Sequence, residues 1–129
     1  MSGSLLLDTN AVIAIFANDR AALDLLRANY ECLLPSTVLG ELYFGAAHFA
    51  KSIENRKRID RFSSSIAVLP SDAVTAAHYG RIKNELKVAG SPIPENDIWI
   101  ASIAVQYNLT LMSNDRHFDN IRGLTRAAW

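Results

Sequence analysis

The chain has a single cysteine, no net charge and no apolar run long enough to cross a membrane. Cys32 cannot form an internal disulfide by itself, and its apolar surroundings predict a small buried residue in a protein of the reducing cytoplasm. Asp8 interrupts the apolar start and no cationic segment precedes it, which argues against a secretory signal peptide. The 13 Lys and Arg residues balance the 13 Asp and Glu residues, so binding to a polyanion must come from a local patch or a metal ion.

Short apolar runs alternate with helical patterns along the 129 residues, a usual length for one domain. We therefore expect a single domain over residues 1–129. The expected strands are 3–7, 31–34, 66–69, 110–113 and a short last one near 124–127. The expected helices are 11–17, 19–30, 36–49, 51–65, 72–89 and 95–107. Strands separated by helices are typical of a mainly parallel central sheet covered on both faces, so the predicted fold is α/β, a three-layer α/β/α sandwich.

The third expected helix bears on how the chain assembles. Ser36 or Thr37 is expected to cap it, because both follow the proline that ends the second strand. Its apolar stripe is expected to consist of Val38, Leu42, Gly45 and Phe49. The aromatic residues on this helix offer more apolar surface than one face can bury, which favours a symmetric dimer; they are Tyr43, Phe44 and Phe49.

Acidic residues occur in four separate motifs: Asp8 in Leu-Leu-Leu-Asp-Thr-Asn, Glu41 in Glu-Leu-Tyr-Phe-Gly, Asp97 in Asn-Asp-Ile-Trp-Ile-Ala and Asp115 in Met-Ser-Asn-Asp-Arg-His-Phe. Asp8 ends the first expected strand, and Asp115 follows the fourth. Ligands bind at the carboxyl edge of a parallel sheet, so both side chains should point into one site. Asp97 falls on the packed face of its helix, and Glu41 borders an apolar stripe. Together the four predict a carboxylate-lined cleft.

A buried carboxylate at Asp97 needs a partner. Its place in the first turn of a helix gains roughly 0.3–1 kcal/mol from the helix dipole, less than the several kcal/mol that burying an unpaired charge costs. Neighbouring carboxylates also repel one another, so they must take up protons or share a cation. Oxygen ligands favour Mg²⁺ or Mn²⁺ over zinc, which makes one of these ions the expected cofactor.

Each acid also has a purely structural explanation. Asp8 and Asp97 could serve the amino ends of helices. Glu41 could lie on the surface and Asp115 could form a turn. These explanations are the commoner ones for any single acid, but the occurrence of all four at strand ends and inner helix faces reverses that preference.

The ordered motifs resemble those of the PIN-domain ribonucleases, and more closely the VapC-type toxins of toxin–antitoxin pairs. The resemblance covers essentially the whole chain and rests on Leu7-Asp8-Thr9-Asn10, Glu41 to Gly45, Asn96 to Ala101 and Ser113 to Phe118. It implies a PIN-like fold and a Mg²⁺- or Mn²⁺-dependent endoribonuclease whose catalytic and metal-binding residues are Asp8, Glu41, Asp97 and Asp115. It also implies a homodimer whose active site is blocked by a small antitoxin, and an acidic cleft would attract an antitoxin Arg.

The resemblance implies roles for residues around the four acids as well. Thr9, Asn10 and Ser113 match positions that orient the ligands. Asp119 is a further acid in the last motif and could share or replace the role of Asp115, so the fourth ligand stays open between these two.

Two regions are candidates for contact with the RNA substrate. Arg116 and His117 stand beside Asp115, where they could contact phosphate. The basic stretch over 51–61 could follow an RNA backbone. It could equally be a solvated helix face, since one of its i,i+4 pairs is attractive and another is repulsive.

Two other functions fit less well. A phosphoryl-accepting receiver-like domain needs an acidic pair after the first strand and a Lys after the last, whereas Asp8 is followed by Thr and Asn. A PIN-like fold kept as a non-catalytic RNA- or protein-binding module would be marked by lost site acids, and none is lost. The sequence specifies neither the RNA target and its cleavage sequence nor the number of metal ions.

Overall fold

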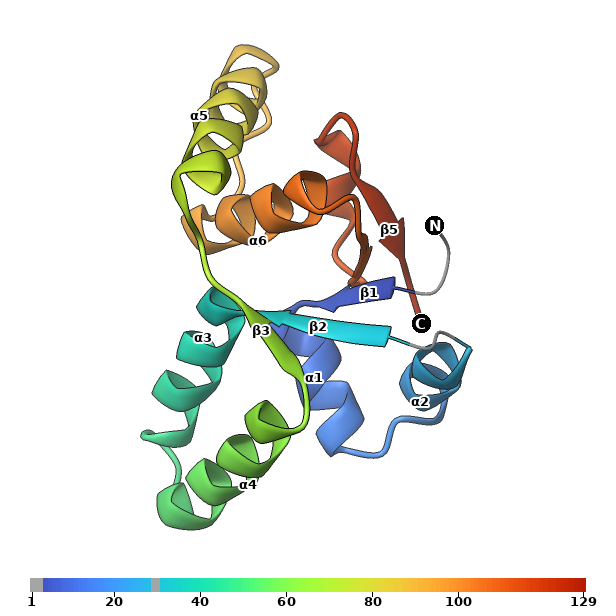
Figure 1. Cartoon of the computed structure of the whole chain (residues 1–129), viewed down its shortest axis with the longest axis vertical. Helices are drawn as coiled ribbons and strands as arrows, with labels where there is room; N and C mark the ends of the chain where they lie inside the picture. The colour runs from blue at the N-terminus through green and yellow to red at the C-terminus, as the bar shows by residue number, and fades with distance from the viewer. Residues whose placement is uncertain (1–3, 29–30) are drawn as a thin grey trace.

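A five-stranded sheet forms the centre of the computed structural model, which describes residues 4–28 and 31–129 (Figure 1). The strands are β1 Ser4–Leu7, β2 Glu31–Pro35, β3 Ala67–Leu69, β4 Thr110–Met112 and β5 Thr125–Ala127. Every pairing is parallel, and the order across the sheet is β3-β2-β1-β4-β5. The predicted parallel α/β fold is confirmed. Gly3 and Tyr30, expected at the ends of a strand and a helix, lie outside the described residues.

Helices cover both faces of the sheet, as predicted for a three-layer sandwich. The α-helices are α1 Thr9–Phe16, α2 Arg20–Arg27, α3 Ser36–Ala46, α4 Ser52–Ser64, α5 Ala73–Val88 and α6 Glu95–Gln106. Helices α1, α3 and α4 lie on one side of the strands, and α5 and α6 lie on the other (Figure 1). Across the described ranges, none of these helices combines the length and apolar composition that a bilayer crossing requires.

The central strand β1 is apolar on both of its faces because helices cover both. Leu5, Leu6 and Leu7 are each at most 1% exposed. They pair with β2 on one side and β4 on the other, with Leu6 opposite Leu33 and Leu111. The apolar run ends at Asp8, the residue at which the chain leaves the sheet.

Strands β1 and β4 are neighbours although most of the chain lies between them. From β1 the chain moves outward through β2 to β3, and then crosses back to β4 and outward to β5. The carboxyl ends of β1 and β4 therefore flank the switch in strand order, where parallel α/β sheets bind ligands. This order differs from the 2-1-3-4-5 order of receiver-like domains, so the receiver alternative is wrong.

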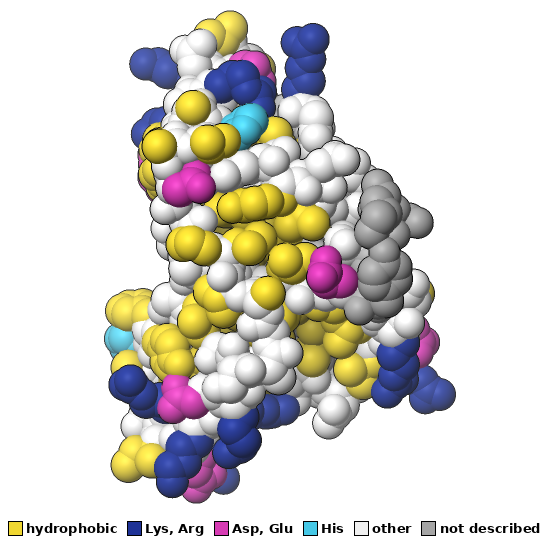
Figure 2. Space-filling view, in the orientation of Figure 1, with side chains coloured by type: hydrophobic (Ala, Val, Ile, Leu, Met, Phe, Trp, Pro, Cys, Tyr) yellow, Lys and Arg dark blue, Asp and Glu magenta, His cyan; other side chains and the backbone are white. Residues whose placement is uncertain are grey.

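The types of side chain on the surface differ between the sheet and its outer helices. In the face shown, apolar side chains gather across the middle, over the region of the edge strand β3, while Lys and Arg side chains gather toward the outer helices above and below (Figure 2). Strand β3 forms this edge of the sheet and has only three residues, all of them apolar. They are exposed or half-buried. Short edge strands limit unwanted pairing with other chains.

Two local predictions are wrong. Ser36 is the first helical residue of α3, whose cap position is Pro35 and has no side-chain hydrogen bond. Helix α3 ends at Ala46, so Phe49 lies beyond it and is 64% exposed rather than part of the buried stripe. Ala46 takes the buried place one turn after Leu42, because the stripe continues at steps of four. The segment after β4 also contains an unpredicted 3₁₀ helix, η1 Arg116–Asn120.

We expect Leu6→Ala to lower the free energy of unfolding by about 2–5 kcal/mol, because it shortens a fully buried side chain of β1 and leaves a cavity in the core. Urea denaturation followed by circular dichroism measures this change. The matched control is Val88→Ala, at a side chain that is 81% exposed, and its effect should stay within about 0.5 kcal/mol. Equal effects of the two substitutions would contradict this description of the core.

Candidate active site

The predicted acidic residues meet in one cleft of about 450 Å³ at the carboxyl edge of the sheet. Its lining includes all of them: Asp8, Glu41, Asp97 and Asp115. They come from the end of β1, from α3, from the first turn of α6 and from the segment after β4. The predicted neighbours Thr9 and Asn10 line the same cleft. The fold thus collects acids that lie far apart in the sequence.

Asp8 is the most buried of these acids, with 5% exposure. It caps α1, because its Oδ1 accepts a hydrogen bond of 2.8 Å from the amide of Ala11. Burial raises the pKa of Asp8, and the charges of Asp115 and Glu41 raise it further, while hydrogen bonds from Ser113 and Ala11 act in the opposite direction. Asp8 therefore serves as a cap and also faces the cleft.

Asp97 and Asp115 lie on either side of an imidazole. His117 Nε2 is 2.9 Å from Asp97 Oδ2, and His117 Nδ1 is 3.1 Å from Asp115 Oδ1. Burial raises the pKa of Asp97, and the neighbouring carboxylates add to this, whereas His117 opposes it. The cleft is thus a place where negative charge is costly and a cation is stabilised.

Glu41 is held toward the cleft by a neighbouring helix. The hydroxyl of Thr9 in α1 donates a hydrogen bond of 2.9 Å to Glu41 Oε1 in α3. This bond joins two helices at the rim of the acidic cleft. Asn10 lines the cleft as an exposed residue.

Ser113 links the acids on adjacent strands. It is fully buried, its hydroxyl oxygen accepts a hydrogen bond of 3.0 Å from the Asp115 amide, and its side chain hydrogen-bonds to Asp8. One hydroxyl thus orients both Asp8 and Asp115, which are brought side by side by the β1–β4 pairing.

Asp119 is paired with a basic side chain of the last strand. Both of its carboxylate oxygens accept hydrogen bonds of 2.8 Å from Arg126 on β5, and this guanidinium lowers the pKa of Asp119. Arg126 also donates a 3.1 Å hydrogen bond to the carbonyl of Ser113. Asp119 does not line the cleft that holds Asp115. Arg126 clamps η1 against the end of β4, a role with no signal in the sequence because the pairing forms only in the folded chain.

Some of the candidates for RNA contact are exposed to solvent, and others contact residues of the protein itself. Arg116 is exposed on η1, whereas the His117 ring is turned toward two carboxylates. In the basic helix α4, Arg58 donates to the carbonyl of Phe16 and lies over its ring, and Arg56 lies over the ring of Tyr43. Part of this basic stretch therefore supports packing between helices.

The donor atoms of the cleft suit a divalent cation. Asp97, Asp115 and His117 each offer a ligand atom, and these three atoms lie within 4.8 Å of one another. Asp8 and Glu41 add further carboxylate oxygens in the same cleft. Oxygen-rich sites with converging carboxylates bind hard divalent ions, so these residues fit a divalent metal ion.

The sequence and the fold are similar to those of known proteins. Residues 5–124 match the family model described as the PIN domain. Ribonuclease VapC2 of Haemophilus influenzae is 37% identical over 130 residues, and the tRNA(fMet)-specific endonuclease VapC of Shigella flexneri is 33% identical over 127; each alignment covers 96% of both chains. The crystal structure of VapBC2 from Rickettsia felis bound to a promoter DNA fragment superimposes with a TM-score of 0.88 at 31% identity, covering 98% of both chains.

We expect Asp97→Asn to stabilise the metal-free protein at pH 7. The pKa of Asp97 in the folded chain lies above its usual value of 3.8, so stability is lost as the pH rises through the folded pKa and the carboxylate becomes charged. The variant should unfold on the order of a few degrees higher in EDTA at pH 7. This difference should vanish below pH 3.8, where the carboxyl is protonated in both states.

Thermal unfolding followed by circular dichroism across this pH range checks the expectation. Asp24→Asn is the control, because Asp24 is 65% exposed and pairs only at 3.9 Å with Arg27. A variant at Asp97 that is less stable than the wild type in EDTA at pH 7 would contradict the account of charge repulsion.

Proposed function

The chain belongs to the PIN-domain family, among its VapC-type ribonucleases, and from this we propose that it is a metal-dependent endoribonuclease acting as the toxin of a toxin–antitoxin pair. The observation that carries the proposal is the convergence of four carboxylates in one cleft at the switch in strand order. A non-catalytic binding module has no need to maintain such mutually repelling groups. We further propose that residues 1–129 act as one PIN-like domain in the cytoplasm.

The metal site that we propose uses the acids of the cleft and binds Mg²⁺ or Mn²⁺: Asp8, Glu41, Asp97 and Asp115. A bound ion of this kind supplies Lewis acidity, which makes water a better nucleophile and neutralises charge on the phosphoryl oxygens. Ser113 orients Asp8 and Asp115, so the carboxylates are placed before a ligand arrives. Asp115 rather than Asp119 is the proposed fourth acid, because Asp119 is paired with Arg126.

Hydrolysis also needs a group that accepts the proton of the attacking water. We propose Glu41 for this role, because Thr9 holds it at the rim of the cleft and it lies outside the close group around His117. Arg116 is exposed next to Asp115, where it would contact a phosphate of the RNA and hold the chain across the cleft.

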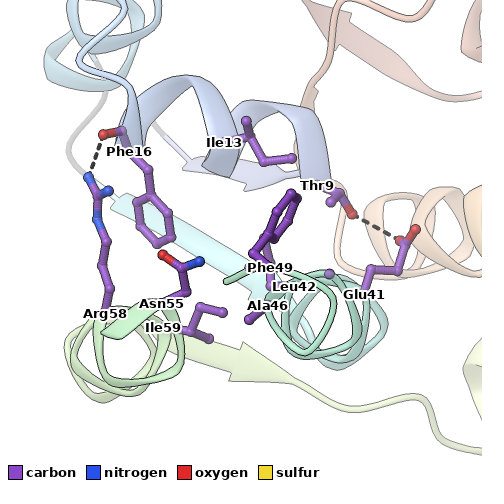
Figure 3. A pocket seen from close by; sticks show the side chains of 11 residues that line it. Thr9, Ile13, Phe16, Glu41, Leu42, Ala46, Phe49, Asn55, Arg58 and Ile59 are labelled. Carbon is purple, nitrogen blue, oxygen red and sulfur yellow. Dashed lines mark hydrogen bonds between the residues drawn. The ribbon is translucent and has the colours of Figure 1, made fainter. Parts of the chain in front are cut away.

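We propose that the antitoxin docks in an apolar groove next to the acidic cleft. The groove has a volume of about 260 Å³ and lies between α1, α3 and α4 (Figure 3). Thr9 and Glu41 stand at one end of it and Arg58 at the other, with Ile13 and Phe49 between them (Figure 3). Ile13 is 52% exposed and Phe49 is 64% exposed, so a partner would bury apolar surface here.

The groove and the cleft share two lining residues, Thr9 and Glu41. A polypeptide that lies in the groove can therefore extend a cationic side chain to the carboxylates. An Arg is the best match, because its planar guanidinium pairs with carboxylates through two parallel hydrogen bonds. We propose that this pairing occupies the site and excludes the metal ion.

A homodimer is a separate proposal that rests on other exposed residues. Phe44 on α3 is 70% exposed and Ile53 on α4 is 71% exposed. These side chains belong to neighbouring helices and would be buried against a second copy of the chain. Light scattering should then give about twice the chain mass of 14.2 kDa.

We expect single-stranded RNA to be cleaved in Mg²⁺ or Mn²⁺ and not in EDTA, and we expect Asp97→Asn and Asp115→Asn to lower the rate at least about 100-fold by removing charge that holds the ion. Asp119→Asn is the matched control. It should keep most of the activity, because Asp119 contacts Arg126 and does not line the cleft that would hold the ion. Gel assays with a labelled RNA, and calorimetric Mn²⁺ titrations of each variant, measure both effects. Full cleavage in EDTA would exclude the proposed mechanism.

We expect Phe49→Ala to weaken binding of the proposed antitoxin by about 30-fold, since an anchoring aromatic contributes about 2 kcal/mol. Phe44→Ala should leave this affinity unchanged and shift the light-scattering mass toward the monomer. The same antitoxin should lower the affinity of the wild type for Mn²⁺. A reversal of the two Phe effects, or an unchanged Mn²⁺ affinity, would refute the assignment of the two surfaces.

A further inference from the structure

His117 lies next to the acidic cleft, between two of the carboxylates that line it. Its Nε2 atom is buried and makes no hydrogen bond within the described chain, although Asp97 Oδ2 is only 2.9 Å away. The contact is close, but it lacks the alignment that a hydrogen bond requires. A buried ring nitrogen that lacks a hydrogen bond needs a physical reason.

The spacing of these two atoms matches that of two ligands on one ion. Neighbouring ligands in an octahedral shell at about 2.1 Å from the ion lie about 3.0 Å from each other. The separation of 2.9 Å between Nε2 and Asp97 Oδ2 agrees with this value. Each atom would then direct a lone pair at a shared cation rather than a proton at the other.

The second ring nitrogen supports the same arrangement. Nδ1 lies 3.1 Å from Asp115 Oδ1, on the opposite side of the imidazole from Asp97. Metal-binding histidines commonly donate the hydrogen of their other nitrogen to a carboxylate, which sets the tautomer and the direction of the ring. Asp115 is placed to do this through one oxygen while it offers the other to the cleft.

The backbone that carries His117 is anchored on both sides. Phe118 is 1% exposed, packs in the core and contacts the imidazole edge to face at 4.6 Å. One position further, Asp119 is held by Arg126. These contacts fix η1, so a rigid element rather than a loose loop holds the imidazole between Asp97 and Asp115.

We propose that His117 is a nitrogen ligand of the divalent ion, through Nε2, and that Asp115 orients its ring through Nδ1. The proposal rests on the proposed function and deepens it. A mixed nitrogen and oxygen donor set favours transition-metal ions such as Mn²⁺ over Mg²⁺, because imidazole is a softer ligand than carboxylate. The site would then select Mn²⁺ more strongly than four carboxylates alone would.

Electron spin echo spectroscopy of the protein loaded with Mn²⁺ tests this ligand directly, since it detects a histidine nitrogen bound to the ion. The sequence has only 3 histidines, which makes the assignment simple. We expect the nitrogen signal in the wild type and in His48→Gln, where the replaced residue is exposed, and its loss in His117→Gln. The Mn²⁺ dissociation constant of His117→Gln should rise by about 10-fold or more, whereas that for Mg²⁺ should change less.

The ratio of the Mn²⁺ and Mg²⁺ dissociation constants separates ligand loss from misfolding. A folding defect would weaken the binding of both ions equally, whereas loss of a nitrogen ligand would weaken Mn²⁺ binding more. A nitrogen signal that is absent from the wild type, or retained in His117→Gln, would overturn the proposal while leaving the carboxylate site intact. Mn²⁺ that binds neither the wild type nor Asp97→Asn would overturn the proposed function as well. Equal weakening for both ions in His117→Gln would also argue against a selective ligand.

Discussion

Mutual repulsion among carboxylates at one sheet edge is the constraint around which the site is arranged. The sheet brings Asp8 and Asp115 side by side, and the first turn of α6 adds Asp97 to the same cleft. The raised pKa values of Asp8 and Asp97 reflect the resulting cost. A core in which β1 is buried on both faces supplies the stability that holds these groups together. The metal-free site is thus strained electrostatically, and a cation relieves that strain.

The parts of the site that local patterns specify are the parts that the sequence could predict. Asp8 follows an apolar strand and Asp97 lies on the packed face of a helix, so strand and helix periodicity place both of them. Phe49 fits the period of α3 but comes after the helix has ended, an error that periodicity cannot detect. The Asp119–Arg126 pair and the contacts of His117 depend on how η1 packs against β5, which no local pattern encodes.

In the proposed function, catalysis and inhibition would be linked through Thr9 and Glu41, the two residues that line both the groove and the cleft. The Thr9–Glu41 hydrogen bond joins α1 to α3, and these helices also form two walls of the groove. A ligand that spreads the groove would act on the orientation of Glu41 as well as on access to the acids. One polypeptide could therefore block RNA, displace the ion and move the proton acceptor, and each effect would add to the selectivity of inhibition.

The clamp from Arg126 to Asp119 and Ser113 also has a consequence during synthesis of the chain. A ribosome completes Asp8 and its helix early, whereas Arg126 is added after nearly all of the described residues. Until β5 has emerged and paired with β4, η1 lacks its contact with Arg126. The contacts that hold η1 next to the acidic cleft are therefore completed by one of the last elements of the chain to be synthesised.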